Sequence, residues 1–109
     1  MNVYISIGNS DNRLTQQEWV DYVAIVQRTI LPAADRVHGN WRSLPDEPFQ
    51  NACWLIEIKP RTARSTKRDL AEIAHRYRQT SIAWATGRTQ FISGLCDEGA
   101  CIEYQEDQR

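Results

Sequence analysis

The sequence has few of the residues on which special chemistry or covalent crosslinking depends. Its 109 residues include three cysteines, two histidines and one methionine. An odd number of cysteines in a chain that can build a hydrophobic core favours a reducing compartment over a disulfide framework. No apolar run approaches the roughly 20 residues of a membrane span, and the sequence opens with strand-like residues in place of a signal peptide. We therefore expect a cytoplasmic protein that does not cross a membrane.

A strong charge of either sign is also missing. The net formal charge is −1, so no global field attracts nucleic acid or a membrane. Residues 59–78 hold seven basic and two acidic side chains, whereas residues 97–109 hold five acids and one arginine. Aromatic residues are not interleaved with these basic ones, which favours a solvated helix face over a nucleic-acid surface. We expect one domain at 1–94, an acidic tail at 95–109 and no nucleic-acid partner.

The spacing of apolar residues predicts the order strand, helix, strand, strand, helix, strand, strand. Apolar and other residues alternate over Val3–Ile7, as they do in a strand. A capping box of Thr15 and Glu18 begins the first helix, and Pro32 is expected to end that helix. The other expected elements are strands at Arg36–Leu44 and Asn51–Lys59, a helix start at Thr66 and Asp69, and a hairpin of Ser81–Ala85 with Thr89–Ser93 around Gly87 and Arg88. This order predicts a ferredoxin-like α+β sandwich (βαββαββ), with an antiparallel sheet and two helices on one face.

The sheet face without helices is expected to be half apolar. In the strand at 36–44, Val37, Gly39 and Trp41 should share one side. The residues expected on the bare face of the sheet are Tyr4, Ser6, Cys53, Leu55 and Trp84. An uncovered apolar face of this kind usually finds a partner, so we expect a homo-oligomer, a dimer or higher.

The candidate ligand-binding residues fall in three groups. The first is the loop between the first strand and the capped helix, where backbone N–H groups and short polar side chains suit an anion; a simple connection rich in turn-forming residues is the alternative. The second group flanks the turn at residues 45–48, and the third follows the second helix. The candidates are Asn9, Ser10, Asp11 and Arg13, then Trp41, Arg42, Gln50 and Asn51, and finally Arg78, Gln79, Trp84 and Arg88.

These residue types indicate a small phosphate-bearing ligand. An aromatic ring, a guanidinium and side-chain amides are the groups that recognise a base and its phosphates. Trp41 or Trp84 would stack on the base, and the arginines would hold the phosphates. The alternative is that the same residues serve only packing and helix capping.

A catalytic signature is absent from the sequence. There is no Ser-His-Asp pattern, nucleophile elbow or dinucleotide fingerprint. The gap between Cys96 and Cys101 is longer than zinc sites usually have, so we expect no metal and no cofactor. We therefore expect a protein that is not an enzyme. Three alternatives remain open: a protein-interaction inhibitor acting on a host protein, a small nucleic-acid-binding module, and a small hydrolase or transferase that uses His38 or His75.

Three stretches carry a resemblance to a known family. They are Val3–Asp11 (VYISIGNSD), Gln50–Trp54 (QNACW) and Gln79–Trp84 (QTSIAW). Together with the order of elements, they resemble small phage and prophage proteins of the Thoeris anti-defence family, which sequester cyclic nucleotide immune signals. The resemblance implies a non-enzymatic oligomer that holds a nucleotide in pockets between subunits. It assigns no ligand residue to this chain.

Overall fold

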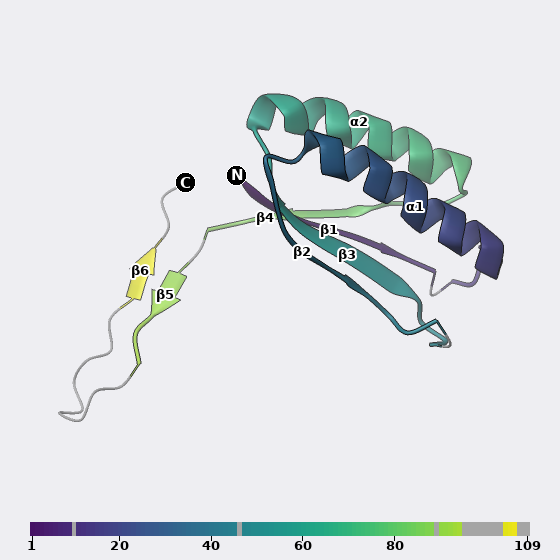
Figure 1. The fold of residues 1–109 in the computed structure, drawn as a ribbon, viewed down its shortest axis with the longest axis horizontal. Coiled ribbons are helices and arrows are strands. Elements are labelled where there is room, and N and C mark those ends of the chain that lie inside the picture. Colours follow the sequence, from purple (N-terminus) through teal and green to yellow (C-terminus); the bar gives the residue numbers. More distant parts are fainter. Residues whose placement is uncertain (10, 46, 89, 95–103, 107–109) are drawn as a thin grey trace.

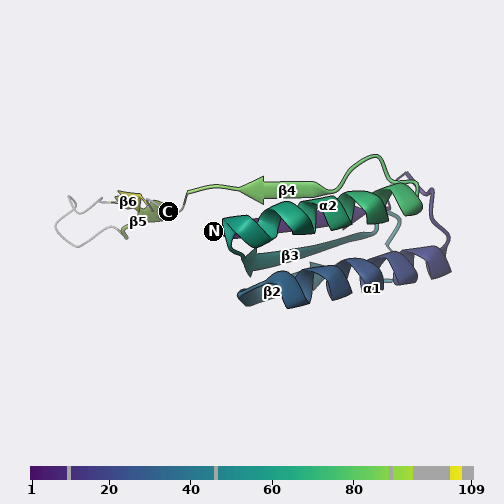
Figure 2. The same cartoon turned by 90° about the horizontal axis from the view of Figure 1, so that it is seen from above.

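The computed structural model describes residues 1–9, 11–45, 47–88, 90–94 and 104–106. Its elements, in chain order, are β1 (Asn2–Gly8), α1 (Gln16–Ala33), β2 (Arg36–Arg42), β3 (Asn51–Glu57), α2 (Pro60–Arg76), β4 (Ala83–Thr86), β5 (Gln90–Ile92) and β6 (Tyr104–Glu106). The first four strands form an antiparallel sheet in the order β2-β3-β1-β4. Figures 1 and 2 show α1 and α2 side by side over one face of this sheet. This small α+β arrangement is compatible with a ferredoxin-like fold.

The hydrophobic core lies between this sheet and the two helices. Val3 and Ile5 of β1 pair with Ile56 and Trp54 of β3, and all four side chains are completely buried. The helices add apolar residues at helical spacing, which places them on the stripe that faces the sheet. The buried apolar residues of the helices are Trp19, Tyr22, Val23, Val26 and Ile30 in α1 and Ala63, Leu70, Ile73 and Ala74 in α2.

The predicted start of α1 is confirmed, whereas its predicted end is wrong. Thr15 Oγ1 accepts a hydrogen bond from Glu18 N at 3.1 Å, and Thr15 N donates to Glu18 Oε1 at 3.0 Å, which completes the capping box. Pro32 lies inside the last turn, and the helix continues to Ala33. A proline in a final turn removes a single backbone bond, and the N–H of Ala34, two residues later, still donates to the carbonyl of Ile30.

The second helix begins at Pro60, six residues before the predicted start at Thr66. Proline fits the first helical position because the N–H that it lacks has no acceptor within the helix there, and its fixed φ suits the helix. Thr66 is not a cap: it is buried within α2, and its hydroxyl donates to the carbonyl of Thr62 at 2.9 Å. The capping-like spacing of Thr66 and Asp69 therefore falls inside the helix.

A β-bulge changes which residues of β2 share a face. Val37 pairs with Ile56, but the register then shifts, and Gly39 pairs with Leu55. Residues directly opposite each other in adjacent strands point to the same side of a sheet. Val37 therefore lies on the helix side, with Ile56, whereas Gly39 and Trp41 lie on the opposite side. The prediction that all three share one side is wrong because His38 is an extra residue in the ladder.

The sheet surface opposite the helices is called the open face here. Trp84, which was expected there, pairs with the buried residue Ile5 and so lies on the helix side. The open face consists of Asn2, Tyr4, Ser6, Gly8, Arg36, Gly39, Trp41, Asn51, Cys53, Leu55, Glu57, Ala83 and Ala85. Its largest exposed apolar side chains are Trp41, Tyr4 and Leu55, with 55%, 46% and 38% of their surface accessible. The half-apolar bare face is thus present, with Trp41 in place of Trp84.

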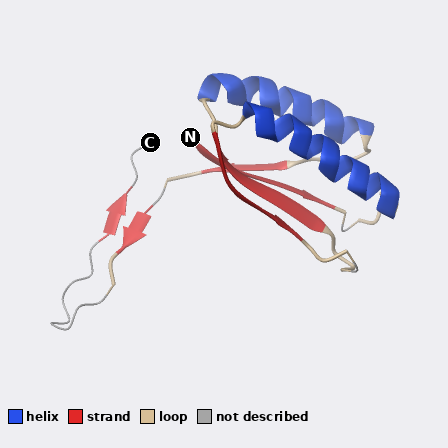
Figure 3. Ribbon diagram, in the orientation of Figure 1, coloured by secondary structure: helices blue, strands red, loops and turns tan. Residues whose placement is uncertain are grey.

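The predicted C-terminal hairpin is also wrong. β4 pairs with β1 as an edge of the main sheet, and β5 pairs with β6 in a separate two-stranded sheet (Figure 3). β6 lies within the stretch that was expected to be an acidic tail, while residues 95–103 and 107–109 are outside the described part of the chain. The domain limits at 94 and 95 stay a prediction. Neither described helix is long and apolar enough to cross a membrane.

Candidate functional site

A cavity of about 350 Å³ lies between α1 and the loop that joins β2 to β3. Its volume is at the lower end of the range of small-molecule sites. We call it the α1 cavity, and it is lined by Gln16, Trp19, Val20, Val23, Ala24 and Gln27 of α1 and by Arg42, Ser43, Pro45, Gln50 and Asn51 of the β2–β3 region. Three of the predicted ligand residues, Arg42, Gln50 and Asn51, therefore meet at one cavity.

The α1 wall of this cavity follows from the helical repeat. Gln16, Val20 and Gln27 are four and seven residues apart, so they form one stripe along the helix. This stripe lies next to the buried stripe of α1. The ring of Trp19 and the methyl groups of Val23 form the inner side of the cavity. Val20 is 59% exposed, although it is apolar. The cavity thus has an apolar wall with an amide at each end.

Arg42 supplies the positive charge of the α1 cavity. It ends β2 opposite Ala52, which turns its side chain toward the helices. Its Nη2 donates to Gln27 Oε1, which also accepts from Trp54 Nε1 at 3.3 Å. Among the described residues no carboxylate forms a salt bridge with Arg42. The guanidinium is therefore positioned by a neutral amide, and its charge is left for an anion.

The opposite end of the cavity is held by a network of amides. Gln50 Nε2 donates to Gln16 Oε1 at 2.8 Å, and Gln16 Nε2 donates back to Gln50 Oε1 at 3.2 Å. Gln50 Oε1 also accepts from Asn9 Nδ2 at 3.1 Å. Near the rim, Ser43 Oγ accepts from the backbone N–H of Asn51 at 2.9 Å. These bonds fix the polar wall before any ligand arrives, which lowers the entropy cost of binding.

In the described part of the β1–α1 loop, four backbone N–H groups that were expected to be free for an anion are bonded within the protein, those of Asn9, Asn12, Arg13 and Leu14. Asn9 N donates to the Gln50 carbonyl at 2.9 Å, and Asn12 N donates to the Asn9 carbonyl at 3.1 Å. Leu14 N donates to Asn9 Oδ1 at 3.0 Å, and Asn9 Nδ2 donates to the Leu14 carbonyl at 3.1 Å. Asn9 is 2% exposed, so it organises the loop from inside. Ser10 lies outside the described residues.

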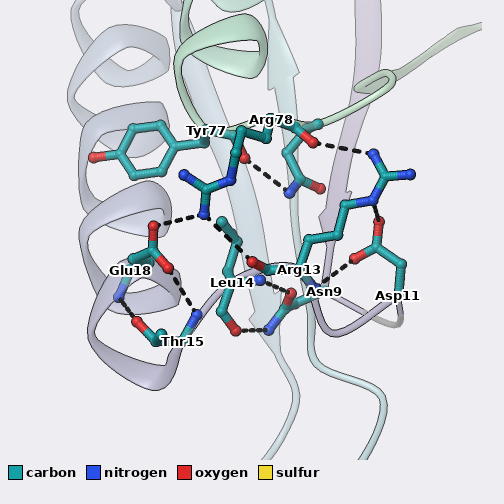
Figure 4. Close-up of polar contacts among 9 residues, drawn as sticks. Asn9, Asp11, Arg13, Leu14, Thr15, Glu18, Tyr77 and Arg78 are labelled. Atoms are coloured by element: carbon teal, nitrogen blue, oxygen red, sulfur yellow. Dashed lines mark hydrogen bonds and ion pairs between the residues drawn. The ribbon is translucent and has the colours of Figure 1, made fainter.

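Arg13 and Arg78 meet where α1 begins and α2 ends (Figure 4). Each donates to the other's backbone carbonyl at 3.3 Å. Arg13 also pairs with Asp11 at 3.3 Å, and Arg78 pairs with Glu18 at 2.7 Å. The hydrogen bond from Arg78, together with the Thr15 N–H, lowers the pKa of Glu18 below its usual range. Two carboxylates thus balance two guanidinium groups, and the cluster joins the helices without an excess of charge for a phosphate.

The remaining candidates lie apart from the α1 cavity. Gln79 follows α2, where its Nε2 donates to the Tyr77 carbonyl at 3.1 Å. Trp41 is on the open face, Trp84 belongs to β4, the edge of the sheet opposite β2, and Arg88 follows that strand in the chain. The predicted single site of twelve residues is therefore divided among several places.

None of the six α1 residues that line the α1 cavity is predicted from the sequence as a ligand residue. They are Gln16, Trp19, Val20, Val23, Ala24 and Gln27. One signal in the sequence could have indicated this wall of the cavity. The apolar residue Val20 lies between two glutamines on a helical stripe next to the core stripe. Within the described residues, no cluster of three or more histidine, cysteine or acidic side chains could hold a metal ion. Cys96 and Cys101 are outside the described part.

In comparisons with known proteins, no protein-family model matches this sequence. No curated protein gives a significant match either.

Proposed function

We propose that the protein is a non-enzymatic binding module that captures a nucleotide-type ligand in the α1 cavity. The observation that carries the proposal is the unbalanced guanidinium of Arg42 beside an apolar wall. A base would lie against Trp19, Val20 and Val23, and a phosphate would accept hydrogen bonds from Arg42. A single guanidinium suits a ligand that places one phosphate charge in the cavity, as a cyclic nucleotide does.

The residues that line the cavity support capture over turnover. Histidine, cysteine and acidic side chains are missing among the described residues of its lining, so general acid–base chemistry has no evident donor or acceptor there. His38 lies on β2, where its Nε2 is 3.3 Å from Glu57 Oε2. His75 lies near the end of α2. Neither histidine lines the cavity.

The wider proposal is a cytoplasmic, ferredoxin-like protein that sequesters a cyclic nucleotide-type immune signal as a homo-oligomer. The sheet order β2-β3-β1-β4 with both helices on one face supports the fold. The open face, with Tyr4 and Trp41 exposed, supports the oligomer. The immune role rests on the resemblance of three short stretches to phage anti-defence proteins.

Calorimetry with a panel of cyclic mononucleotides, cyclic dinucleotides and ADP-ribose derivatives tests the proposal. The Kd of a binding member should rise about tenfold or more in Arg42→Gln, because a charged hydrogen bond is lost. Arg36→Gln is the matched control, since Arg36 is at the other end of β2 and does not line the cavity. The ligand should be recovered unchanged after the protein is denatured.

Two results would contradict this function. One is the absence of heat with every member of the panel at protein concentrations of about 100 μM. The other is equal weakening in Arg36→Gln and Arg42→Gln, which would show that binding follows net charge alone. Conversion of the ligand to a new compound would replace capture with catalysis.

The open face favours a second candidate function, inhibition of a host protein. Trp41 and Tyr4 expose about half of their surface on the open face, and large aromatic side chains dominate many protein interfaces. A stoichiometric host partner that binds the wild-type chain and is lost in Trp41→Ser would support it. A partner that is retained by Trp41→Ser and lost by Arg42→Gln would argue against it.

A further inference from the structure

A second cavity, of about 310 Å³, lies between α2 and the segment that leads into β4. We call it the α2 cavity. Leu70 and Ile82 form its apolar part, and its polar side chains are Lys67, Thr80, Ser81 and Trp84. Because β4 and β2 are opposite edges of the sheet, this cavity is separate from the α1 cavity and shares no lining residue with it.

The polar side chains of the α2 cavity are all able to donate hydrogen bonds. Lysine and the indole N–H only donate, and the two hydroxyls can donate as well. No acidic side chain lines the cavity in the described part of the chain. Asp69 lies two residues from Lys67, and side chains two apart on a helix do not face each other. This lining therefore favours a ligand that brings acceptors and negative charge.

Lys67 and Trp84 each lack the partner that such a ligand would provide. The Lys67 ammonium lies 5.1 Å from the centre of the Trp84 ring, and among the described residues it forms no salt bridge. Trp84 Nε1 is buried without a hydrogen-bond acceptor, although buried donors are nearly always paired. Arg64, one turn earlier on α2, adds positive potential on the same side of the helix.

We propose that the α2 cavity binds a small organic carboxylate. Its apolar body rests on Leu70 and Ile82, and its two oxygens accept from Lys67 Nζ and Trp84 Nε1. Lys67 is exposed, and its four-carbon side chain lets the ammonium turn from the ring toward the carboxylate. The single ammonium of the lining balances the one negative charge of a carboxylate, whereas it would leave one charge of a phosphate dianion unbalanced in the cavity.

The indole N–H resonances of the protein report this binding directly. The chain has four tryptophans, and the resonance of Trp84 is identified by its loss in Trp84→Phe. Benzoate is the probe, benzamide is its neutral counterpart, and phenyl phosphate represents the alternative anion. Benzoate should move the Trp84 resonance downfield, because the N–H gains an acceptor, and benzamide should have at least about tenfold lower affinity, since it lacks the charge.

Variants of Lys67 test whether the charge of its ammonium contributes to benzoate binding in the α2 cavity. Lys67→Gln should weaken benzoate binding about tenfold, and Lys67→Arg should restore most of it. Arg61→Gln is the control on the same helix, because Arg61 does not line the cavity. Arg42→Gln should leave benzoate binding unchanged, so this test is independent of the nucleotide proposal.

Three outcomes would overturn the inference. They are no benzoate-dependent change of the Trp84 resonance, equal binding of benzamide and benzoate, and an unchanged affinity for benzoate in Lys67→Gln. Binding of phenyl phosphate without binding of benzoate would also overturn it, since the ligand class would be wrong.

Discussion

Asn9 Nδ2 donates to Gln50 Oε1 across 3.1 Å, and the backbone N–H of Asn9 donates to the Gln50 carbonyl across 2.9 Å. The two residues are 2% and 4% exposed. Asn9 belongs to the loop before α1, while Gln50 lines the α1 cavity. This pair therefore connects the fold of the loop to the shape of the proposed binding site.

Replacement of Asn9 should destabilise the protein strongly. Asn9→Ala removes three side-chain hydrogen bonds and takes the Asn9 side chain away from the buried N–H and carbonyl of Leu14, while Gln50 Oε1 keeps the bond from Gln16. We expect a loss of about 2–4 kcal/mol in the free energy of unfolding, measured by urea denaturation. Asn40→Ala, at an exposed position of β2, is the control. A loss below about 0.5 kcal/mol for Asn9→Ala would contradict the role given to this side chain.

Arg78 occupies a backbone conformation that favours glycine. Its φ is 59°, and it follows α2 in a Schellman arrangement, in which Arg78 N donates to the His75 carbonyl and Gln79 N donates to the Ala74 carbonyl. Arg78→Gly and Arg78→Ala both lose the guanidinium, but only alanine keeps the strain. The glycine variant should be more stable than the alanine variant by about 1 kcal/mol in thermal or urea unfolding. Equal stability of the two would show that the strain is absent.

The pairing of Glu18 makes stability depend on pH in the acid range. Arg78 and the Thr15 N–H lower the pKa of Glu18, so folding favours its charged form. The stabilisation is present above the ordinary glutamate pKa of about 4.3, and it is lost as the pH falls through the lower pKa of the folded state. Glu18→Gln should therefore unfold more easily than the wild type at pH 7, and the difference should shrink toward pH 3. A difference that stays constant with pH would exclude this ion pair as the cause.

Tyr22 buries a hydroxyl that has no hydrogen-bond partner among the described residues. Burial raises the pKa of this phenol to about 12. Tyr22→Phe removes the unpaired group with little change in shape, so its Tm at pH 7 should equal or exceed that of the wild type. Because the pKa is higher in the folded state, ionisation of Tyr22 does not lower the free energy of unfolding below about pH 10, where an unfolded tyrosine begins to ionise. The free energy of unfolding then falls as the pH rises toward 12. The variant should lose less stability over that interval, and a lower Tm at pH 7 would point to an unseen partner.

The sequence predicted only part of the candidate site, because some of its residues are far apart along the chain. Arg42, Gln50 and Asn51 flank one turn, so the sequence brings them together by itself. Gln27 and Gln16 reach them from α1 across 15 and 34 residues of chain. No local pattern records that approach, because it depends on how α1 lies over the sheet.

The sequence by itself determined the elements whose causes are local. The alternation of Val3, Ile5 and Ile7 produces a strand, and the capping box of Thr15 and Glu18 starts a helix, because these residues interact with near neighbours. Only the tertiary structure decided that the bulge at His38 separates Val37 from Trp41, that β4 joins β1, and that Trp84 faces α2. Those features depend on pairing between distant strands, where a shift of one residue exchanges the two faces of the sheet.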